Sequence, residues 1–257
     1  MSRVITGLCL LAVGIYVISN GGISLLMFLW LIGVLAFYEV QSITELRSQF
    51  LMVINMIFYT LLMGFLYQGE PSFGLAYFGL MLVCSFLFTY EFFKKQLLFR
   101  NVAFLNNLKY FCYIYFGFSS IYLIRELSQG LLMVVVMFLA IWATDVFAYY
   151  GGKRFGKRQL STISPNKTIE GTVSGVIAAM ISVAVVCYIK DLPFVLVLGG
   201  AAIGLSGQLG DLYESLIKRT YNVKDSSNIL PGHGGILDRA DSSLFVAPIL
   251  FILLSFL

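Results

Sequence analysis

Nine apolar runs, each about as long as a helix that crosses a bilayer, limit what this chain can fold into. A spanning helix needs roughly 20 consecutive apolar residues, and the polar breaks between these runs are short. The predicted spans are 3–19, 22–42, 48–68, 73–92, 104–124, 130–150, 168–189, 192–217 and 242–257. The sequence therefore predicts an all-α fold, a polytopic membrane helix bundle with about nine transmembrane helices.

The composition also indicates a membrane protein. Only 12% of the 257 residues are charged, whereas a soluble domain has about 25%. No long polar stretch interrupts the runs, so we expect one bundle and no separate soluble domain. The net charge of +4 is too small to suggest a nucleic-acid partner. No small-residue cleavage site follows the first run, which we therefore interpret as a membrane helix and not as a signal peptide.

The basic residues predict the orientation of the bundle. Cytoplasmic loops of membrane proteins carry an excess of Lys and Arg. With nine spans, the basic clusters after spans 4, 6 and 8 all lie on one side. Their members are Lys94, Lys95, Arg100, Lys153, Arg154, Lys157, Arg158, Lys167, Lys218, Arg219, Lys224 and Arg239. This agreement predicts an N-inside, C-outside topology with every basic cluster in the cytoplasm.

Charge divides the chain into two parts. Residues 1–125 are the predicted N-terminal transmembrane helices, whose charges stay near the helix ends. Residues 126–257 are the predicted catalytic transmembrane region, with cytoplasmic loops at 151–167 and 218–241. Of the 30 charged residues, 18 lie between Asp145 and Asp241, so we expect the chemistry in the C-terminal half.

The eighth span places glycines and charged residues on one helix face. They are Gly200, Gly204, Gly207, Asp211, Glu214 and Lys218, at spacings of three and four. A packing face that ends in a Glu214–Lys218 ion pair is one interpretation, but it leaves Asp211 unexplained. A carboxylate within a membrane costs about 2.5–3.5 kcal/mol on insertion scales. The same argument applies to Asp145 in span 6, where a structural acid is the alternative. We predict a polar region that both aspartates share.

Two segments between spans 6 and 7 suit phosphate groups. Residues 151–158 have the glycine and lysine spacing of a P-loop, but Arg158 stands where that motif has Ser or Thr. A membrane helix also precedes them, so we predict a flexible basic loop for phosphates or anionic headgroups. A purely topological role for its basic residues is equally open. Ser164 and Pro165 predict the start of the next helix, where N–H groups and Lys167 would bind an anion.

The most polar part of the chain is 215–241, SLIKRTYNVKDSSNILPGHGGILDRAD. Asp238 and Asp241 are hard oxygen ligands of the kind that Mg²⁺ prefers. His233 is the only histidine and stands in a glycine-rich turn. Because no Cys or His lies nearby, we predict that it forms hydrogen bonds or contacts phosphate, and that it is not a zinc ligand.

This run resembles the signature of the phosphatidate cytidylyltransferases, also called CDP-diacylglycerol synthases. The matching residues are Ser215, Lys218, Arg219, Lys224, Asp225, Ser227, Leu230, Pro231, His233, Gly234, Gly235, Ile236, Asp238, Arg239 and Asp241. Upstream, Asp145, Glu170, Asp211, Glu214 and the run 164–168 resemble the family too, so the resemblance covers about 145–241.

The resemblance implies that CTP and phosphatidic acid give CDP-diacylglycerol and pyrophosphate, at the cytoplasmic face of a prokaryotic membrane. It also implies Mg²⁺ in a paired metal site that includes Asp211 and Asp238, and a homodimer in the lipid bilayer. The predicted catalytic residues are Asp145, Asp211, Lys218, Arg219 and Asp238. The predicted substrate-binding residues are Ser164, Lys167, Glu170, Glu214, Ser215, Lys224, Asp225, His233, Gly234, Arg239 and Asp241.

Two other functions stay open at this stage. A CTP-dependent polyprenol or phytol kinase is also polytopic with basic loops, but it is not expected to have the whole run from Ser215 to Asp241. A secondary transporter would use the intramembrane aspartates, yet it predicts internal repeats between the two halves. The one-sided charge distribution counts against a transporter.

Overall fold

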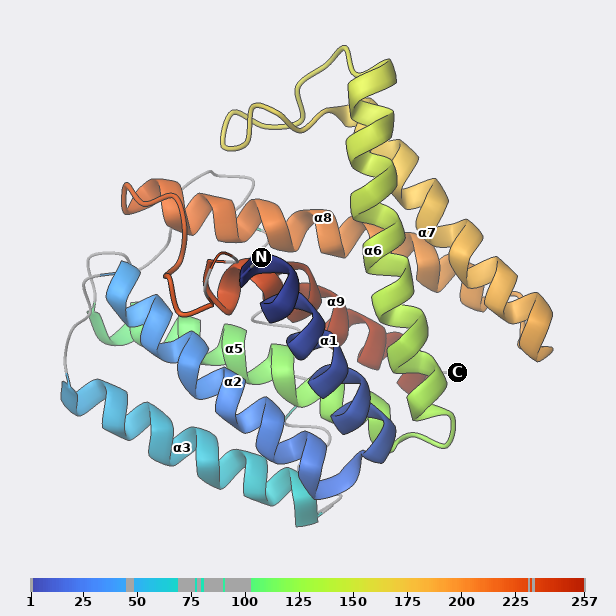
Figure 1. Cartoon of the computed structure of the whole chain (residues 1–257). Coiled ribbons are helices and arrows are strands. Elements are labelled where there is room, and N and C mark those ends of the chain that lie inside the picture. Colours follow the sequence, from blue (N-terminus) through green and yellow to red (C-terminus); the bar gives the residue numbers. More distant parts are fainter. Residues whose placement is uncertain are drawn as a thin grey trace.

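The computed structural model describes residues 2–44, 49–68, 77, 80, 90, 103–230, 232 and 234–256. The helices in this part are α1 (Ser2–Asn20), α2 (Gly22–Ile43), α3 (Gln49–Gln68), α5 (Ala103–Glu126), α6 (Gly130–Phe155), α7 (Ile169–Lys190), α8 (Leu196–Thr220) and α9 (Leu237–Ser255) (Figure 1). The described residues contain two isolated β-bridges and no strand, so the predicted all-α class is confirmed for them. The fourth predicted span, 73–92, lies outside them except for Tyr77, Leu80 and Tyr90.

In the part of the chain that the structure describes, four helical segments are long and apolar enough to cross a membrane. They are Gly22–Ile43, Phe50–Gln68, Gly130–Phe155 and Ile169–Lys190, which match predicted spans 2, 3, 6 and 7. α5 and α8 contain more polar residues, and several of these, such as Asn106, Lys109 and Glu214, are buried. Polar side chains of membrane helices face the bundle interior, where other protein groups can pair with them. The chain is therefore a helical membrane protein.

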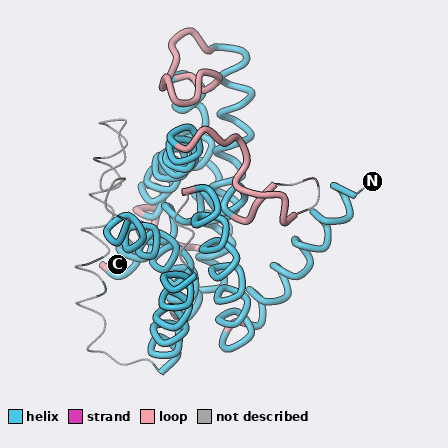
Figure 2. Tube along the Cα trace, turned by 90° about the vertical axis from the view of Figure 1, so that its left-hand side faces the viewer, coloured by secondary structure: helices cyan, strands magenta, loops and turns pink. Residues whose placement is uncertain are grey.

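α9 is the central helix of the C-terminal half. It packs against both α8 and α5, while α6 and α7 form a hairpin that crosses α8 (Figure 1). α2 packs against α5, and α3 packs against α2. Two long loops connect α6 to α7 and α8 to α9, and they are drawn in pink in Figure 2. Because α9 has protein on most sides, both its small and its large side chains are buried along much of its length.

Polar and aromatic pairs join α3 to α5. Asn55 of α3 and Asn107 of α5 exchange side-chain hydrogen bonds of 2.9 and 3.1 Å. Further along both helices, the rings of Tyr59 and Tyr115 pack edge to face with their centroids 6.1 Å apart. Since the two contacts follow the chain direction in both helices, α3 and α5 run parallel.

Glycines let α6 and α7 approach closely. A Cβ atom at Gly151 would lie 2.4 Å from the Ser174 side chain, and one at Gly171 would lie 2.7 Å from the Ala148 carbonyl oxygen. Gly171 is therefore a packing position between the two helices. The predicted helix end at Gly151 and Gly152 is wrong, because both glycines serve this contact and α6 continues for another turn.

The start of α7 also differs from the sequence prediction. The Thr168 side chain accepts a hydrogen bond of 3.1 Å from the Gly171 N–H and caps the helix. Ser164 and Pro165, predicted as the cap and first residue, belong instead to a turn in which the Lys167 N–H donates to the Ser164 carbonyl. Proline suits this turn because its φ angle is fixed in advance.

The loop between α8 and α9 is shorter than predicted. α8 continues to Thr220, so Lys218 lies in its last turn. α9 begins at Leu237, five residues before the predicted span 242–257, and therefore Asp238 and Asp241 lie inside the helix. Both corrections bring charged residues onto rigid helices, where their positions are better defined than on a loop.

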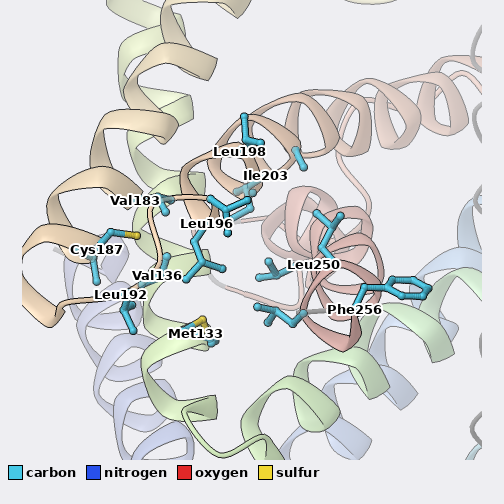
Figure 3. A pocket seen from close by; sticks show the side chains of 16 residues that line it. Met133, Val136, Val183, Cys187, Leu192, Leu196, Leu198, Ile203, Leu250 and Phe256 are labelled. Carbon is cyan, nitrogen blue, oxygen red and sulfur yellow. The ribbon is translucent and has the colours of Figure 1, made fainter.

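An apolar cavity of about 310 Å³ lies between α6, α7, α8 and α9 (Figure 3). Its lining includes Val136, Leu196 and Leu250, and all sixteen lining residues are apolar or, in one case, cysteine. The lining residues on α8 and α9 come from the start of α8 and the end of α9, whereas the acidic residues lie at the opposite ends of these two helices. The cavity has no group that could handle phosphates.

Candidate active site

Charged residues from several elements meet where α6 and α8 end and where α7 and α9 begin. They form two clusters. The lysine–aspartate cluster is Asp145, Lys167, Asp211 and Asp241. The loop cluster is Glu39, Glu214, Lys218, Ser226 and Asp238. We call residues 221–236 the signature loop; it connects α8 to α9 beside both clusters.

The lysine–aspartate cluster collects side chains from α6, the 156–168 loop, α8 and α9. Lys167 forms an ion pair with Asp211, with Nζ 2.5 Å from Oδ2. The Ser215 hydroxyl lies 3.5 Å from the other Asp211 oxygen. Asp145 and Asp241 lie close enough to interact electrostatically with both Asp211 and Lys167. The predicted polar region shared by Asp145 and Asp211 is therefore present, with one lysine among three acids.

Asp238 is a carboxylate of the loop cluster that is surrounded by hydrogen-bond donors. Its oxygens accept hydrogen bonds from Lys218 Nζ (2.8 Å), the Gly235 N–H (2.8 Å), and the N–H and hydroxyl of Ser226 (both 3.0 Å). Burial disfavours a charged carboxylate, and these hydrogen bonds compensate that cost. Asp238 is therefore an anion that organises the signature loop.

Lys218 connects two acids of the loop cluster. Its Nζ lies 2.5 Å from Glu214 Oε2 and 2.8 Å from Asp238 Oδ1. The Glu214–Lys218 ion pair, which the sequence also allowed as the end of a simple packing face, is thus present. It belongs to a larger network that includes Asp238. Glu214 is buried, and its other oxygen, Oε1, has no hydrogen-bond partner among the described residues. A buried polar atom of this kind is a place where an ion or water would bind.

Glu39 was not identified from the sequence, yet it is fully buried beside the signature loop. It comes from the penultimate turn of α2, in the N-terminal half. Its carboxylate accepts a hydrogen bond of 2.6 Å from the Ser227 hydroxyl, and it lies 3.1 Å from the Ser226 hydroxyl, whose single proton it shares with Asp238. The Ile236 and Leu237 N–H groups donate at 2.7 and 2.8 Å. The site therefore contains a carboxylate from outside the predicted catalytic region.

Two glycines of the signature loop make room for these carboxylates. Gly234 has a φ angle of +84°, and a Cβ atom there would lie 2.7 Å from Asp238 Oδ2. A Cβ atom at Gly235 would overlap the Ser226 hydroxyl and approach the Glu39 carboxylate to 2.6 Å. Glycine is needed at both positions because the loop backbone passes directly over the acids.

Glu170 lies in the first turn of α7 and binds the basic loop. One of its oxygens accepts hydrogen bonds from the Lys157 and Arg158 N–H groups, at 3.0 and 3.2 Å. The other lies 3.3 Å from Arg158 Nε. Glu170 thus holds the 156–168 loop, and this contact fixes the segment that carries Lys167. Its predicted role in substrate binding stays a prediction.

The remaining predicted residues lie around the clusters. Arg219, Lys224, Asp225 and Arg239 are exposed, and Arg219 donates a 3.4 Å hydrogen bond to the Val223 carbonyl. Exposed charged side chains at these positions can be reached by a ligand from solution. His233 lies outside the described residues, so its predicted role stays a prediction.

The clusters supply hard oxygen atoms, but no ready-made metal cage. Among the described residues, no three His, Cys, Asp or Glu side chains converge on one point. Mg²⁺ is usually held by one or two carboxylates, with water and substrate phosphates as the other ligands. Asp211 fits this use because its side chain is 35% exposed, and the unpartnered Oε1 of Glu214 fits it as well.

A comparison of the sequence with models of protein families identifies the family of this chain. The cytidylyltransferase family model matches residues 1–257, the whole chain. The chain belongs to the cytidylyltransferase family.

Curated relatives agree with the cytidylyltransferase assignment. A Bacillus subtilis (strain 168) protein named phosphatidate cytidylyltransferase is 36% identical over 269 residues, covering 98% of this chain and 97% of its own length. A Staphylococcus haemolyticus protein of the same name is 35% identical, with 98% of each chain covered. A Staphylococcus aureus (strain COL) protein of that name is 47% identical over 165 residues, 63% of this chain and 62% of its own. The resemblance inferred from the signature is confirmed, and it extends over the N-terminal half.

Proposed function

We propose that this membrane protein transfers the cytidylyl group of CTP to phosphatidate, giving CDP-diacylglycerol and pyrophosphate. Family membership and the printed names of the relatives support this reaction. The observation that carries it at the site is the pairing of acids with lysines, Asp211 with Lys167 and Asp238 with Lys218. Both substrates are polyanions, so a site for them needs positive charge and metal-binding oxygens at the same place.

The reaction needs positioning more than proton transfer. An oxygen of the phosphatidate monoester attacks the α-phosphorus of CTP, and the bond from that phosphorus to the oxygen that bridges to the β-phosphate breaks. The second pKa of a phosphate monoester is about 6, so the nucleophile is largely a dianion at neutral pH and needs no general base. Lys167 and Lys218 would offset the electrostatic repulsion between the negatively charged phosphates of the two substrates.

We further propose that Asp211 and Asp238 hold Mg²⁺ in a paired metal site. The exposed part of Asp211 and the unpartnered oxygen of buried Glu214 support this, since both can accept a cation. When bound, Mg²⁺ would neutralise phosphate charge and stabilise the leaving pyrophosphate. Asp238 would have to exchange some of its present hydrogen-bond donors for the ion.

A product assay tests the function. Purified protein is incubated with CTP, phosphatidate and Mg²⁺ in mixed micelles, and the nucleotide and phosphate products are quantified. We expect CDP-diacylglycerol and pyrophosphate in equal amounts, and neither product when phosphatidate or Mg²⁺ is omitted. Formation of CDP with a phosphorylated polyprenol or phytol, and no pyrophosphate, would instead support the kinase alternative.

The proposed setting is a homodimer in the cytoplasmic membrane of a prokaryote, with nine spans, N-inside and C-outside. The parallel course of α3 and α5 supports the order of spans, because the nine-span topology places one crossing between them. The contact between Glu39, near the end of α2, and the start of α9 also agrees with this topology, because span 2 ends and span 9 begins on the same side of the membrane. The division into 1–125 and 126–257 stays a prediction.

Accessibility labelling tests this orientation. Single cysteines replace Gln159 or Asn228, both exposed loop residues, in a background without the native cysteines. We expect both to react with an impermeant reagent only from the cytoplasmic side of oriented vesicles. Reaction of either cysteine from the outside would contradict the nine-span order and the cytoplasmic site.

A further inference from the structure

Glu39 has an environment that packing alone does not explain. It is the one charged residue of α2, its exposure is 0%, and its four donors lie 187 to 198 residues further along the chain. A buried charge is costly unless several hydrogen bonds compensate it. All four donors belong to one short stretch, from Ser226 to Leu237, so the compensation comes entirely from the signature loop and the first residue of α9.

Two of these donors are backbone groups at the start of α9. The N-cap residue of this helix, Ile236, makes no side-chain capping hydrogen bond. The Glu39 oxygens accept from the N–H groups of Ile236 and Leu237 instead. A negative charge at this position also interacts favourably with the helix dipole. Glu39 therefore caps α9 from another helix.

The Glu39 contacts continue directly to Asp238. The Ser226 hydroxyl lies 3.1 Å from Glu39 Oε2 and 3.0 Å from Asp238 Oδ2, while the Ser226 N–H donates to Asp238. Gly235 is enclosed by Ser226 and Glu39, and its N–H also donates to Asp238. The groups that orient Asp238 are thus the same groups that Glu39 holds.

We infer that Glu39 is a positioning residue of the reaction: it fixes the signature loop and the start of α9, and through them Asp238 and its partner Lys218. This inference rests on the proposed function. The N-terminal half then has a role in the site as well as in the membrane. Glu39 itself does not touch the reacting groups, so its loss should lower turnover more than substrate binding.

Glu39→Gln is the principal test, with Gln41→Ala as the matched control. The amide replaces one acceptor oxygen by a donor, and one of the α9 N–H groups then loses its acceptor. Gln41 is also buried near the end of α2, and its Nε2 has no partner among the described residues. We expect Glu39→Gln to lower kcat at least about tenfold, as for other residues that orient a site residue. KM for CTP should change less than about threefold, and Gln41→Ala should leave kcat within about twofold.

Hydrogen exchange of the full-length protein in detergent provides a second readout. The amides of Ile236 and Leu237 should exchange faster in Glu39→Gln than in wild type, whereas residues 157–168 of the other loop should not change. If Glu39→Gln does not fold, Glu39→Asp takes its place, with kcat lowered at least about threefold and faster exchange at the same amides. Unchanged exchange at 236–237, or faster exchange with normal kcat, would overturn the inference.

The two readouts separate this inference from the proposed function. If wild type forms no CDP-diacylglycerol, the proposed function fails while the exchange measurement still decides whether Glu39 orders the loop. If wild type is active and Glu39→Gln raises KM for CTP with kcat unchanged, the residue serves binding and the positioning role is wrong.

Discussion

Asp211 and Asp238 are both acids beside a lysine, yet their surroundings differ. Asp238 accepts hydrogen bonds from a lysine, two backbone N–H groups and a hydroxyl, and its side chain is 10% exposed. Asp211 has one lysine and one long contact with Ser215, and its side chain is 35% exposed. The carboxylate of Asp238 is surrounded by hydrogen-bond donors of the protein, whereas the carboxylate of Asp211 has room for a further ligand.

This difference separates two tasks within the site. A carboxylate has about four lone-pair positions, so an acid whose positions are all occupied by donors of the protein mainly defines a conformation. An acid with unused positions on a partly open surface can bind an ion. Asp238 therefore orders the signature loop in addition to its proposed share in the metal site, while Asp211 is the carboxylate more readily available to metal and phosphate.

The largest expected effect follows from removing the available carboxylate. Asp211→Asn keeps the size of the side chain but removes the charge that Mg²⁺ and Lys167 require. We expect kcat to fall at least about 100-fold, with the protein still folded in the membrane. Glu126→Gln is the matched control, because it changes an exposed acid at the far end of α5. Retention of more than about a tenth of the wild-type kcat in Asp211→Asn would remove Asp211 from the metal site.

A smaller effect is expected at Lys167. Lys167→Ala should lower kcat/KM at least about tenfold, since a charge-assisted phosphate contact contributes about 1.5–3 kcal/mol. The loss should appear when CTP and phosphatidate are varied independently in mixed micelles. Lys190→Ala, at the other end of α7, removes the same type of charge from an exposed position and should leave kcat/KM within about twofold. Equal losses in the two variants would mean that general charge, and not a site contact, explains the result.

The smallest expected effects are at two arginines, Arg219 in the last turn of α8 and Arg158 in the basic loop. Arg219 is exposed beside the loop cluster, so Arg219→Ala should still cost about tenfold in kcat/KM through a lost phosphate contact. Arg158 is bound to Glu170 in the basic loop, and Arg158→Ala should cost less than about threefold, mainly by changing the dependence on lipid surface charge. If Arg158→Ala is the more damaging change, the basic loop handles phosphate directly.

The sequence predicted those parts of the site that a helical repeat brings together. Asp211, Glu214 and Lys218 lie on α8 as the spacing indicated, and the cost of an acid within a membrane correctly associated Asp145 with Asp211. Helix ends were harder to predict. Gly151 is a packing residue inside α6 because of contacts with α7, which local sequence does not contain.

Glu39 could not be placed from its neighbours either. Its partners lie almost 200 positions away, and only the fold brings α2 beside the signature loop. The available signal was the one used for Asp145 and Asp211, a single carboxylate near the end of an apolar helix. Applied to the N-terminal half, the same argument would have identified Glu39 as a residue that needs partners.

Hydrogen exchange of Asp211→Asn and Asp238→Asn tests the separation of tasks most directly. The measured quantity is the exchange rate of the amides in residues 224–240, in full-length protein purified in the same detergent. Both variants should lose turnover, but only Asp238→Asn should exchange faster here, because only Asp238 holds the Ser226 and Gly235 amides. Faster exchange in both variants, or in neither, would contradict the account.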